Sequence, residues 1–154
     1  MKVYLIQHGE PKSETEDPER PLTEKGKEVV ESVARYCASL GLDVAQILHS
    51  GRLRATQTAE LFAQYLRQPQ TAKEEKGLGP LDDPTEAKRL IEQAERPLMI
   101  VGHLPHLSRL VSLLVLGTPE YEIVKFKMGG VVCLSESDNK WFVDWVLVPE
   151  LIHR

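Results

Sequence analysis

Short apolar runs alternate with segments of helical periodicity along most of this chain. Residues 3–6, 44–48 and 98–101 have the length and the β-branched content of buried strands. Between these runs, apolar residues recur every three or four positions, which is typical of helices that pack on one face. Strands that alternate with helices usually pair in parallel, because each helix carries the chain back across the sheet. We therefore expect an α/β fold with a largely parallel sheet.

Four helices and a terminal hairpin are expected around these strands. Capping residues, prolines and glycines mark most of the helix ends. The first helix should begin after Thr23 and stop at Gly41, and the second should run over 53–66. The third should begin after Asp83 and end near residue 95, and the fourth should begin at Pro105 and stop at Gly117. Residues 68–81 resemble a loop with room for one short extended piece. Segments 130–134 and 141–148 should pair around a turn at 135–140, which adds antiparallel pairing to the sheet.

The size and charge of the chain limit its partners and its location. A length of 154 residues is enough for one domain with a buried core. The formal net charge of -4 argues against a nucleic-acid backbone or an anionic membrane as the main partner. Cys37 and Cys133 lack a metal-binding spacing and should be buried, although a disulfide remains open. No run is long enough for a signal peptide or a membrane span, so we expect a cytoplasmic protein.

Histidines and arginines gather directly after the three expected parallel strands. His8 follows the first strand, Arg52 and Arg54 follow the second, and His103 follows the third. Ligands of open parallel sheets bind beyond the carboxyl ends of the strands, so these side chains should face one crevice. Gly9 is expected to let the backbone turn sharply after His8 and a ligand approach closely.

Each of these residues has a structural explanation as well as a chemical one. His8 is either a core or capping histidine or a nucleophile, since a neutral imidazole nitrogen can attack phosphorus. Arg52 and Arg54 lie where the positive end of a helix dipole disfavours cations. They indicate either an anion site or ion pairs with the acidic loop over residues 10–20. His103 is either a histidine whose ring hydrogen-bonds only within the protein or a hydrogen-bond donor to a phosphoryl group in transfer. The histidine spacings do not predict a metal site.

Three segments resemble the motifs of one enzyme family. Residues 7–10, Gln-His-Gly-Glu, resemble the Arg-His-Gly motif of the histidine phosphatase superfamily, also called the phosphoglycerate mutase-like fold. Residues 50–59 resemble its Ser-Pro-x-x-Arg-Ala-x-Gln-Thr-Ala segment, and residues 101–105 resemble the segment of its second histidine. The Arg-Pro-Leu-Thr stretch at 20–23, Gly26 and the short chain resemble the SixA-type phosphohistidine phosphatases. The resemblance covers nearly the whole chain.

This resemblance implies a fold and a set of site residues. It implies one domain over residues 1–154, a three-layer α/β/α arrangement around a mostly parallel mixed sheet. His8 would be the phosphorylated nucleophile, and Arg54 and His103 would act with it in catalysis. The residues expected to bind the substrate phosphate are Gln7, Arg20, Arg54 and His103. The resemblance implies no metal and no organic cofactor.

Gln7 stands where the family has arginine. Glutamine keeps hydrogen-bond donors but lacks the charge and the bidentate fork of a guanidinium. The substitution therefore predicts either weaker phosphate binding, compensation by Arg20 or Arg52, or loss of activity.

A general acid is not identified by the sequence. Asp82 and Asp83 lie in a plausible region, but Asp83 is already explained as a helix cap, and Glu10 lies beside His8 in a loop. Imidazole, whose conjugate acid has a pKa of about 6.5, leaves more readily than an alkoxide. The missing acid therefore favours a phosphohistidine substrate over a sugar phosphate.

These observations predict a phosphatase that acts on a phosphohistidine-bearing protein, such as a phosphotransfer domain or a phosphocarrier. Two alternatives stay open: a broad small-molecule phosphomonoesterase, and a phosphate-binding module with little or no turnover. A mutase is less favoured, because the chain has no obvious insertion that would retain a phosphorylated intermediate.

Overall fold

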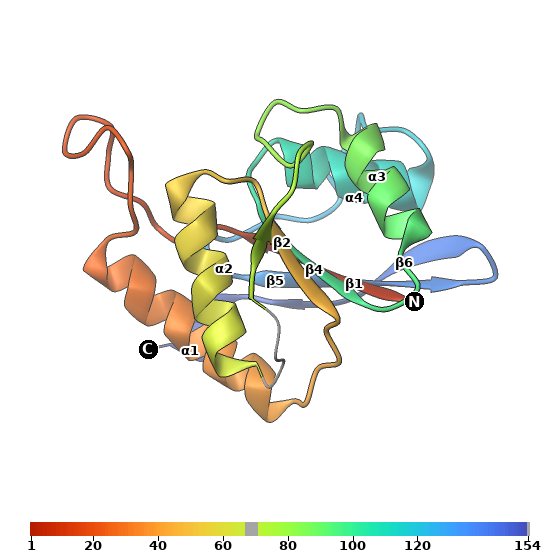
Figure 1. The fold of residues 1–154 in the computed structure, drawn as a ribbon. Helices are drawn as coiled ribbons and strands as arrows, with labels where there is room; N and C mark the ends of the chain where they lie inside the picture. Colours follow the sequence, from red (N-terminus) through yellow and green to blue (C-terminus); the bar gives the residue numbers. More distant parts are fainter. Residues whose placement is uncertain (67–70, 154) are drawn as a thin grey trace.

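The computed structural model describes residues 1–66 and 71–153, and within these a six-stranded sheet lies between two pairs of helices (Figure 1). The strands are β1 (Lys2–Gln7), β2 (Gln46–His49), β3 (Lys73–Glu74), β4 (Leu98–Gly102), β5 (Val131–Ser137) and β6 (Lys140–Leu147). The helices are α1 (Glu24–Ser39), α2 (Leu53–Tyr65), α3 (Pro84–Gln93) and α4 (His106–Leu116), followed by a 3-10 turn, η1 (Pro149–Leu151). The predicted three-layer α/β/α architecture is confirmed.

The sheet is mixed, with the order β3-β2-β4-β1-β5-β6. Strands β1 to β4 pair in parallel, whereas β5 is antiparallel to both of its neighbours. Strand β3 is the short extended piece expected within 68–81, of which residues 68–70 lie outside the described residues. The terminal hairpin is longer than predicted, because only Asp138 and Asn139 separate its strands. Their φ values of 52° and 62° are left-handed, as a two-residue hairpin turn of this kind requires.

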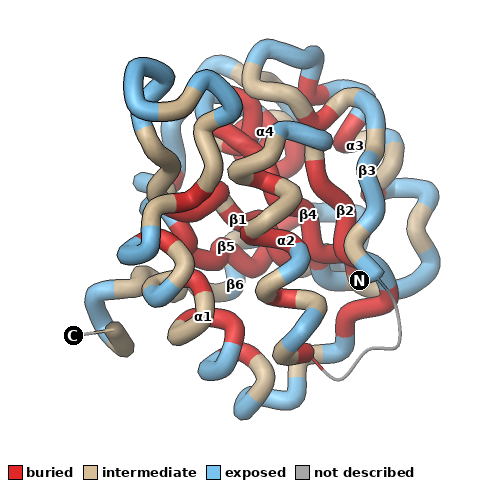
Figure 2. The backbone as a smooth tube through the Cα atoms, turned by 60° about the vertical axis from the view of Figure 1, so that its left-hand side comes forward, coloured by how far each residue is buried: buried red, intermediate tan, exposed pale blue. Residues whose placement is uncertain are grey.

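Side chains that alternate along the strands fill two cores, one on each face of the sheet. Leu5 of β1 packs in the core that α3 and α4 cover, and the next residue, Ile6, packs in the core that α1 and α2 cover. Cys37 and Cys133 are free and fully buried in the second core, which confirms the prediction that both are buried. Buried backbone accordingly concentrates in the strands and on the inner sides of the helices (Figure 2). No helix among the described residues combines the length and apolar character needed to cross a membrane.

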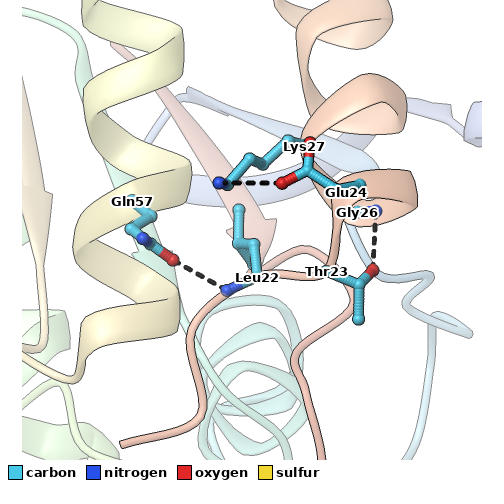
Figure 3. Close-up of polar contacts among 6 residues, drawn as sticks. All are labelled: Leu22, Thr23, Glu24, Gly26, Lys27 and Gln57. Carbon is cyan, nitrogen blue, oxygen red and sulfur yellow. Dashed lines mark hydrogen bonds and ion pairs between the residues drawn. The ribbon is translucent and has the colours of Figure 1, made fainter.

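Helix α1 begins where Thr23 predicts, and its first turn anchors the preceding loop. The Thr23 hydroxyl oxygen accepts the backbone N–H of Gly26 at 2.9 Å (Figure 3). The backbone N–H of Thr23 donates to the Glu10 carbonyl at 2.9 Å. One residue earlier, the N–H of Leu22 donates to the side-chain oxygen of Gln57 in α2 at 2.7 Å (Figure 3). Both ends of the loop between residues 10 and 23 are therefore fixed beside the end of β1.

Gly26→Ala is expected to lower the free energy of unfolding by about 1–3 kcal/mol, as overpacking against a rigid neighbour does. A Cβ at Gly26 would collide with the backbone carbonyl oxygen of Glu10 and lie 3.1 Å from its nitrogen. Alanine stabilises a helix relative to glycine by about 1 kcal/mol when nothing collides with its Cβ. Any decrease in the free energy of unfolding is therefore due to the collision. Urea unfolding checks this, with the exposed neighbour Lys25→Ala as control. A Gly26→Ala protein as stable as the control would contradict the close packing of this loop on α1.

Candidate active site

The register of the sheet brings His8 and His103 together. Strands β1 and β4 are paired with Gln7 opposite Gly102, so the residues that follow leave the sheet side by side. The backbone N–H of His8 donates to the Gly102 carbonyl at 3.1 Å. The centroids of the two imidazole rings are 5.1 Å apart, and their planes are inclined by 52°. The two histidines predicted to share a crevice are therefore neighbours.

His8 has the protonation state of a nucleophile. Its Nδ1 lies 2.8 Å from the Gly9 carbonyl oxygen, which can only accept, so the ring proton sits on Nδ1 and the lone pair on Nε2. The pKa of His8 is lowered to about 4, mainly by burial and also by the charges of Arg54 and Arg20. The hydrogen bond to the Gly9 carbonyl opposes this shift. The ring is therefore neutral at pH 7, and the residue keeps 8% of its surface exposed. An uncharged Nε2 is available to attack an electrophile.

Gly9 is needed for close packing rather than for a left-handed backbone. The residue has no left-handed φ, but a Cβ there would lie 2.7 Å from Cγ2 of Val30 in α1. Its N–H donates to the Thr58 hydroxyl oxygen at 2.9 Å, and that hydroxyl donates to the Arg54 carbonyl at 2.8 Å. Thr58 thus joins the backbone after His8 to the helix that carries Arg54.

The charges of three arginines, Arg20, Arg52 and Arg54, act on the histidines, and none of the three forms an ion pair with a carboxylate of the described residues. The ion pairs found in the described part of the chain involve other side chains, so the alternative that the arginines pair with the acidic loop is not supported. Nε of Arg54 is buried, and no described group accepts its proton. Burial, followed by the charges of Arg20 and Arg52, lowers the pKa of Arg54. Unpaired cations that repel one another in a partly buried pocket create a binding site for an anion.

Arg20 lies in the loop that precedes α1. Its φ of 51° is left-handed, which is uncommon for an arginine and typical of constrained functional positions. The backbone N–H of Arg20 donates to the Asp17 carbonyl at 2.9 Å, and its Nε donates to the Lys12 carbonyl at 3.2 Å. The loop therefore holds Arg20 near His8, whose pKa its charge lowers.

His103 is almost fully covered, with only 1% of its surface exposed. Its Nε2 lies 2.6 Å from Oγ of Ser50, while its Nδ1 is buried without a partner among the described residues. Burial lowers the pKa of His103 to about 3, and the neighbouring His8 and Arg54 add to the effect. A neutral imidazole and a buried guanidinium thus each keep one nitrogen unpartnered beside a free nucleophile. A tetrahedral phosphoryl group, with several acceptor oxygens, matches this arrangement.

Residues 3–82 match the family model described as the histidine phosphatase superfamily (branch 1), which is just over half of the chain. The chain belongs to the histidine phosphatase superfamily. The family resemblance seen in the sequence is therefore confirmed, and membership supports a phosphatase.

Similar proteins match this chain over nearly its whole length. The chain is 30% identical to an uncharacterised protein from a Picosynechococcus species, over 93% of this chain and 94% of that one. It is 27% identical to the phosphohistidine phosphatase SixA of Escherichia coli, over 97% and 94% of the two chains. A solved structure of the protein histidine phosphatase SixA complexed with tungstate has the same fold, with a TM-score of 0.83 at 23% identity, over 98% of this chain and 99% of that one.

Gln7, at the position of the arginine in the histidine phosphatase motif, ends β1 beside the two histidines. Its backbone carbonyl accepts the N–H of Gly129 at 2.8 Å. Its side chain makes no hydrogen bond with another described residue. Gln7 therefore lies directly before His8 at the end of β1, and the charge of the family arginine is absent.

The three candidate acids have other contacts in this histidine phosphatase. The Asp83 carboxylate accepts the N–H of Thr85, which lowers its pKa and keeps it ionised as a helix cap. The Glu10 carboxylate accepts the Thr23 hydroxyl at 2.9 Å. The Asp82 carboxylate accepts the N–H of Gly79 at 2.7 Å. None of these hydrogen bonds links a candidate acid to His8.

The other buried histidines lie outside the phosphoryl pocket. Nδ1 of His49 accepts the N–H of Gly51 at 3.1 Å and hydrogen-bonds to the Thr56 hydroxyl at 3.2 Å, which fixes the turn into α2. His106 is fully buried at the start of α4, and neither ring nitrogen reaches hydrogen-bond geometry with a described group. Burial lowers the pKa of His106, although the nearby charge of Asp82 favours its protonated form. The described residues contain no group of three or more potential ligands that could hold a metal ion.

Ser50 and Thr58 contact the site, and sequence reasoning assigned neither a role. Both lie inside the segment that resembles the family motif, four residues before and four residues after Arg54. The i, i+4 spacing of Thr58 from Arg54 was a usable signal, because a threonine hydroxyl in a helix often bonds to the carbonyl four residues earlier. Nothing local signals the contact of Ser50 with His103, since it depends on the pairing of β2 with β4.

Proposed function

We propose that this chain is a phosphohistidine phosphatase, which hydrolyses the phosphoryl group of a phosphohistidine protein through a covalent phospho-His8 intermediate. The observation that carries the proposal is the neutral His8 ring, with Nε2 free, beside the unpaired guanidinium of Arg54. A free nucleophile and a nearby unpaired cation are the two parts that phosphoryl transfer needs.

The reaction would proceed in two displacements at phosphorus. Arg54, His103 and Arg20 would hold the phosphoryl oxygens. Nε2 of His8 attacks in line and forms a P–N bond as the P–N bond to the substrate histidine breaks, and the departing imidazole takes its proton from water. In the second step water attacks the phosphorus of phospho-His8, which releases inorganic phosphate and neutral His8, and the proton lost by this water neutralises the hydroxide left by the first step. The fixed cations offset the negative charge on the transferring group in both steps.

A protein substrate fits the surroundings of the pocket. A cleft of about 290 Å³ lies beside the Ser50–His103 contact, is lined by Arg52 and by the carboxylates of Glu74, Glu75 and Asp82, and leaves space for more than a phosphoryl group. Asp83 and Glu10 are held in other hydrogen bonds, so a leaving group that needs little protonation suits the site. The similarity to SixA proteins supports the same choice. We propose a phosphotransfer domain or a phosphocarrier as partner, and the cytoplasm as location, where the free thiols of the chain would persist.

A comparison of substrates tests this proposal. We expect kcat/KM for a phosphohistidine protein to exceed that for a sugar phosphate by about a hundredfold or more, because the sugar alkoxide lacks a general acid to protonate it. Initial rates of phosphate release at matched concentrations give the ratio. Equal rates for both substrates would favour a broad phosphomonoesterase instead.

Gln7 favours a second candidate, a phosphate-binding module, and Gln7→Arg separates the two. The added guanidinium should tighten binding of inorganic phosphate about tenfold, through one charge-assisted bidentate contact. Gln46→Arg, which adds the same charge at the exposed start of β2, is the matched control. Calorimetric titration measures the affinity, and phosphate release measures turnover. If the wild type binds phosphate but never hydrolyses the phosphohistidine protein, and Gln7→Arg does hydrolyse it, then the wild type is a phosphate-binding module.

A further inference from the structure

Ser50 is the only described hydrogen-bond partner of the His103 ring. The pairing of His49 with Val101 places Ser50 level with Gly102, immediately beside the start of the His103 segment. The contact of 2.6 Å joins Oγ of Ser50 to Nε2 of His103, and the ring is almost fully covered. Because the other ring nitrogen has no partner, Ser50 determines how the ring is oriented and which nitrogen carries its proton.

The hydroxyl of Ser50 has one proton to donate and two lone pairs that accept. The backbone N–H of Arg52 lies 3.3 Å from Oγ and uses one lone pair, since an amide N–H can only donate. Among the described residues, the only acceptor within hydrogen-bond distance of the Ser50 hydroxyl is Nε2 of His103, at 2.6 Å, so donation to Nε2 is the direction that gives the hydroxyl proton a partner. A neutral imidazole that accepts at Nε2 must carry its proton on Nδ1. The opposite tautomer would leave a bare lone pair on Nδ1, which repels a phosphoryl oxygen.

We propose that Ser50 is a positioning residue for phosphoryl transfer: its hydroxyl donates to Nε2 of His103 and so keeps the ring proton on Nδ1, as a donor for a phosphoryl oxygen. The role rests on the proposed function, because the donor is useful only when an oxyanion enters the pocket. Ser50 itself makes and breaks no covalent bond. It acts by fixing the tautomer of His103, as partners of functional histidines commonly do.

The tautomer can be measured without turnover. Nitrogen-15 NMR of histidine-labelled protein at neutral pH, with the His103 signals assigned by a His103→Gln variant, distinguishes a protonated Nδ1 from a protonated Nε2. We expect Nδ1–H in the wild type and in Ser50→Thr, and a shift towards Nε2–H in Ser50→Ala. Thr56→Ala is the matched control, because it removes a hydroxyl that bonds to a different buried imidazole, that of His49.

Kinetics give the second readout. Ser50→Ala should lower kcat about tenfold to a hundredfold, the effect of one misplaced donor, whereas Ser50→Thr and Thr56→Ala should stay near the wild type. A wild-type His103 protonated on Nε2 would overturn the proposal, as would a Ser50→Ala enzyme with the wild-type tautomer and kcat. A wild type without turnover would contradict the proposed function, whereas the NMR result would still show whether Ser50 fixes the tautomer of His103.

Discussion

His8→Ala is expected to reduce turnover of a phosphohistidine protein by on the order of 10⁴-fold or more, the usual effect of removing a catalytic nucleophile. The free Nε2 of His8 is the group that we expect to bond to phosphorus, and the adjacent His103 is held by Ser50 and cannot take its place. The measurement is release of inorganic phosphate under single-turnover conditions. The variant should still bind phosphate, because the guanidiniums remain.

The control for this substitution is His153→Ala, which removes an imidazole that bonds to Ser32 of α1. It should leave turnover unchanged. A His8→Ala protein that retains a tenth or more of the wild-type rate would mean that water attacks the substrate directly or that another group is the nucleophile.

Arg54→Met is expected to lower kcat/KM by on the order of 10²–10³-fold, the effect of losing one fixed donor to a developing charge. The same substitution should leave the unliganded protein at least as stable as the wild type. Burial and the charges of Arg20 and Arg52 disfavour the Arg54 guanidinium, and no carboxylate of the described residues pairs with it. Opposite effects on activity and stability are typical of a residue retained for function.

Phosphate release and thermal unfolding without ligand measure the two effects. Arg54→Lys should recover little activity, because a lysine is a point charge without the planar fork of donors. Arg96→Met is the matched control: Arg96 pairs with Asp43 at 3.3 Å on the surface, so its removal should change neither quantity much. Strong destabilisation by Arg54→Met would show that Arg54 has a structural partner and would contradict an empty anion site.

The sequence predicts the fold well where a single residue decides a boundary. Thr23 and Asp83 cap helices as expected, because their side chains accept backbone N–H groups that lie two or three residues away. The sequence predicts a hairpin turn over 135–140, which is too long, because Asp138 and Asn139 alone form the turn with left-handed φ values. Local chemistry therefore predicts where elements begin, and less reliably how far strands extend.

The site is predictable only in part, for a physical reason. Parallel strands end at one edge of a sheet, so His8 and His103 could be placed together from their positions alone. The contact of Ser50 with His103 depends on strand register, and the approach of Arg20 depends on a left-handed backbone that arginine rarely adopts.

Charge pairing shows the same limit. The sequence contains both an acidic loop and the two arginines at the start of α2, and it does not show whether they meet. In the structure the loop extends outward from the N-terminal end of α1 (Figure 1), and Glu16 bonds within the loop to Ser13. The arginines are therefore left free of these carboxylates, which is the condition for an anion site.

A covalent phosphoryl group on His8 is the central claim, and trapping it tests the claim most directly. The protein is mixed briefly with a ³²P-labelled phosphohistidine protein, quenched in base and digested, and the labelled peptide is sequenced. We predict acid-labile, base-stable label on the N-terminal peptide at His8, which appears and decays at rates that match turnover. Turnover without label on the protein at any time, or label on His103 instead, would contradict the account.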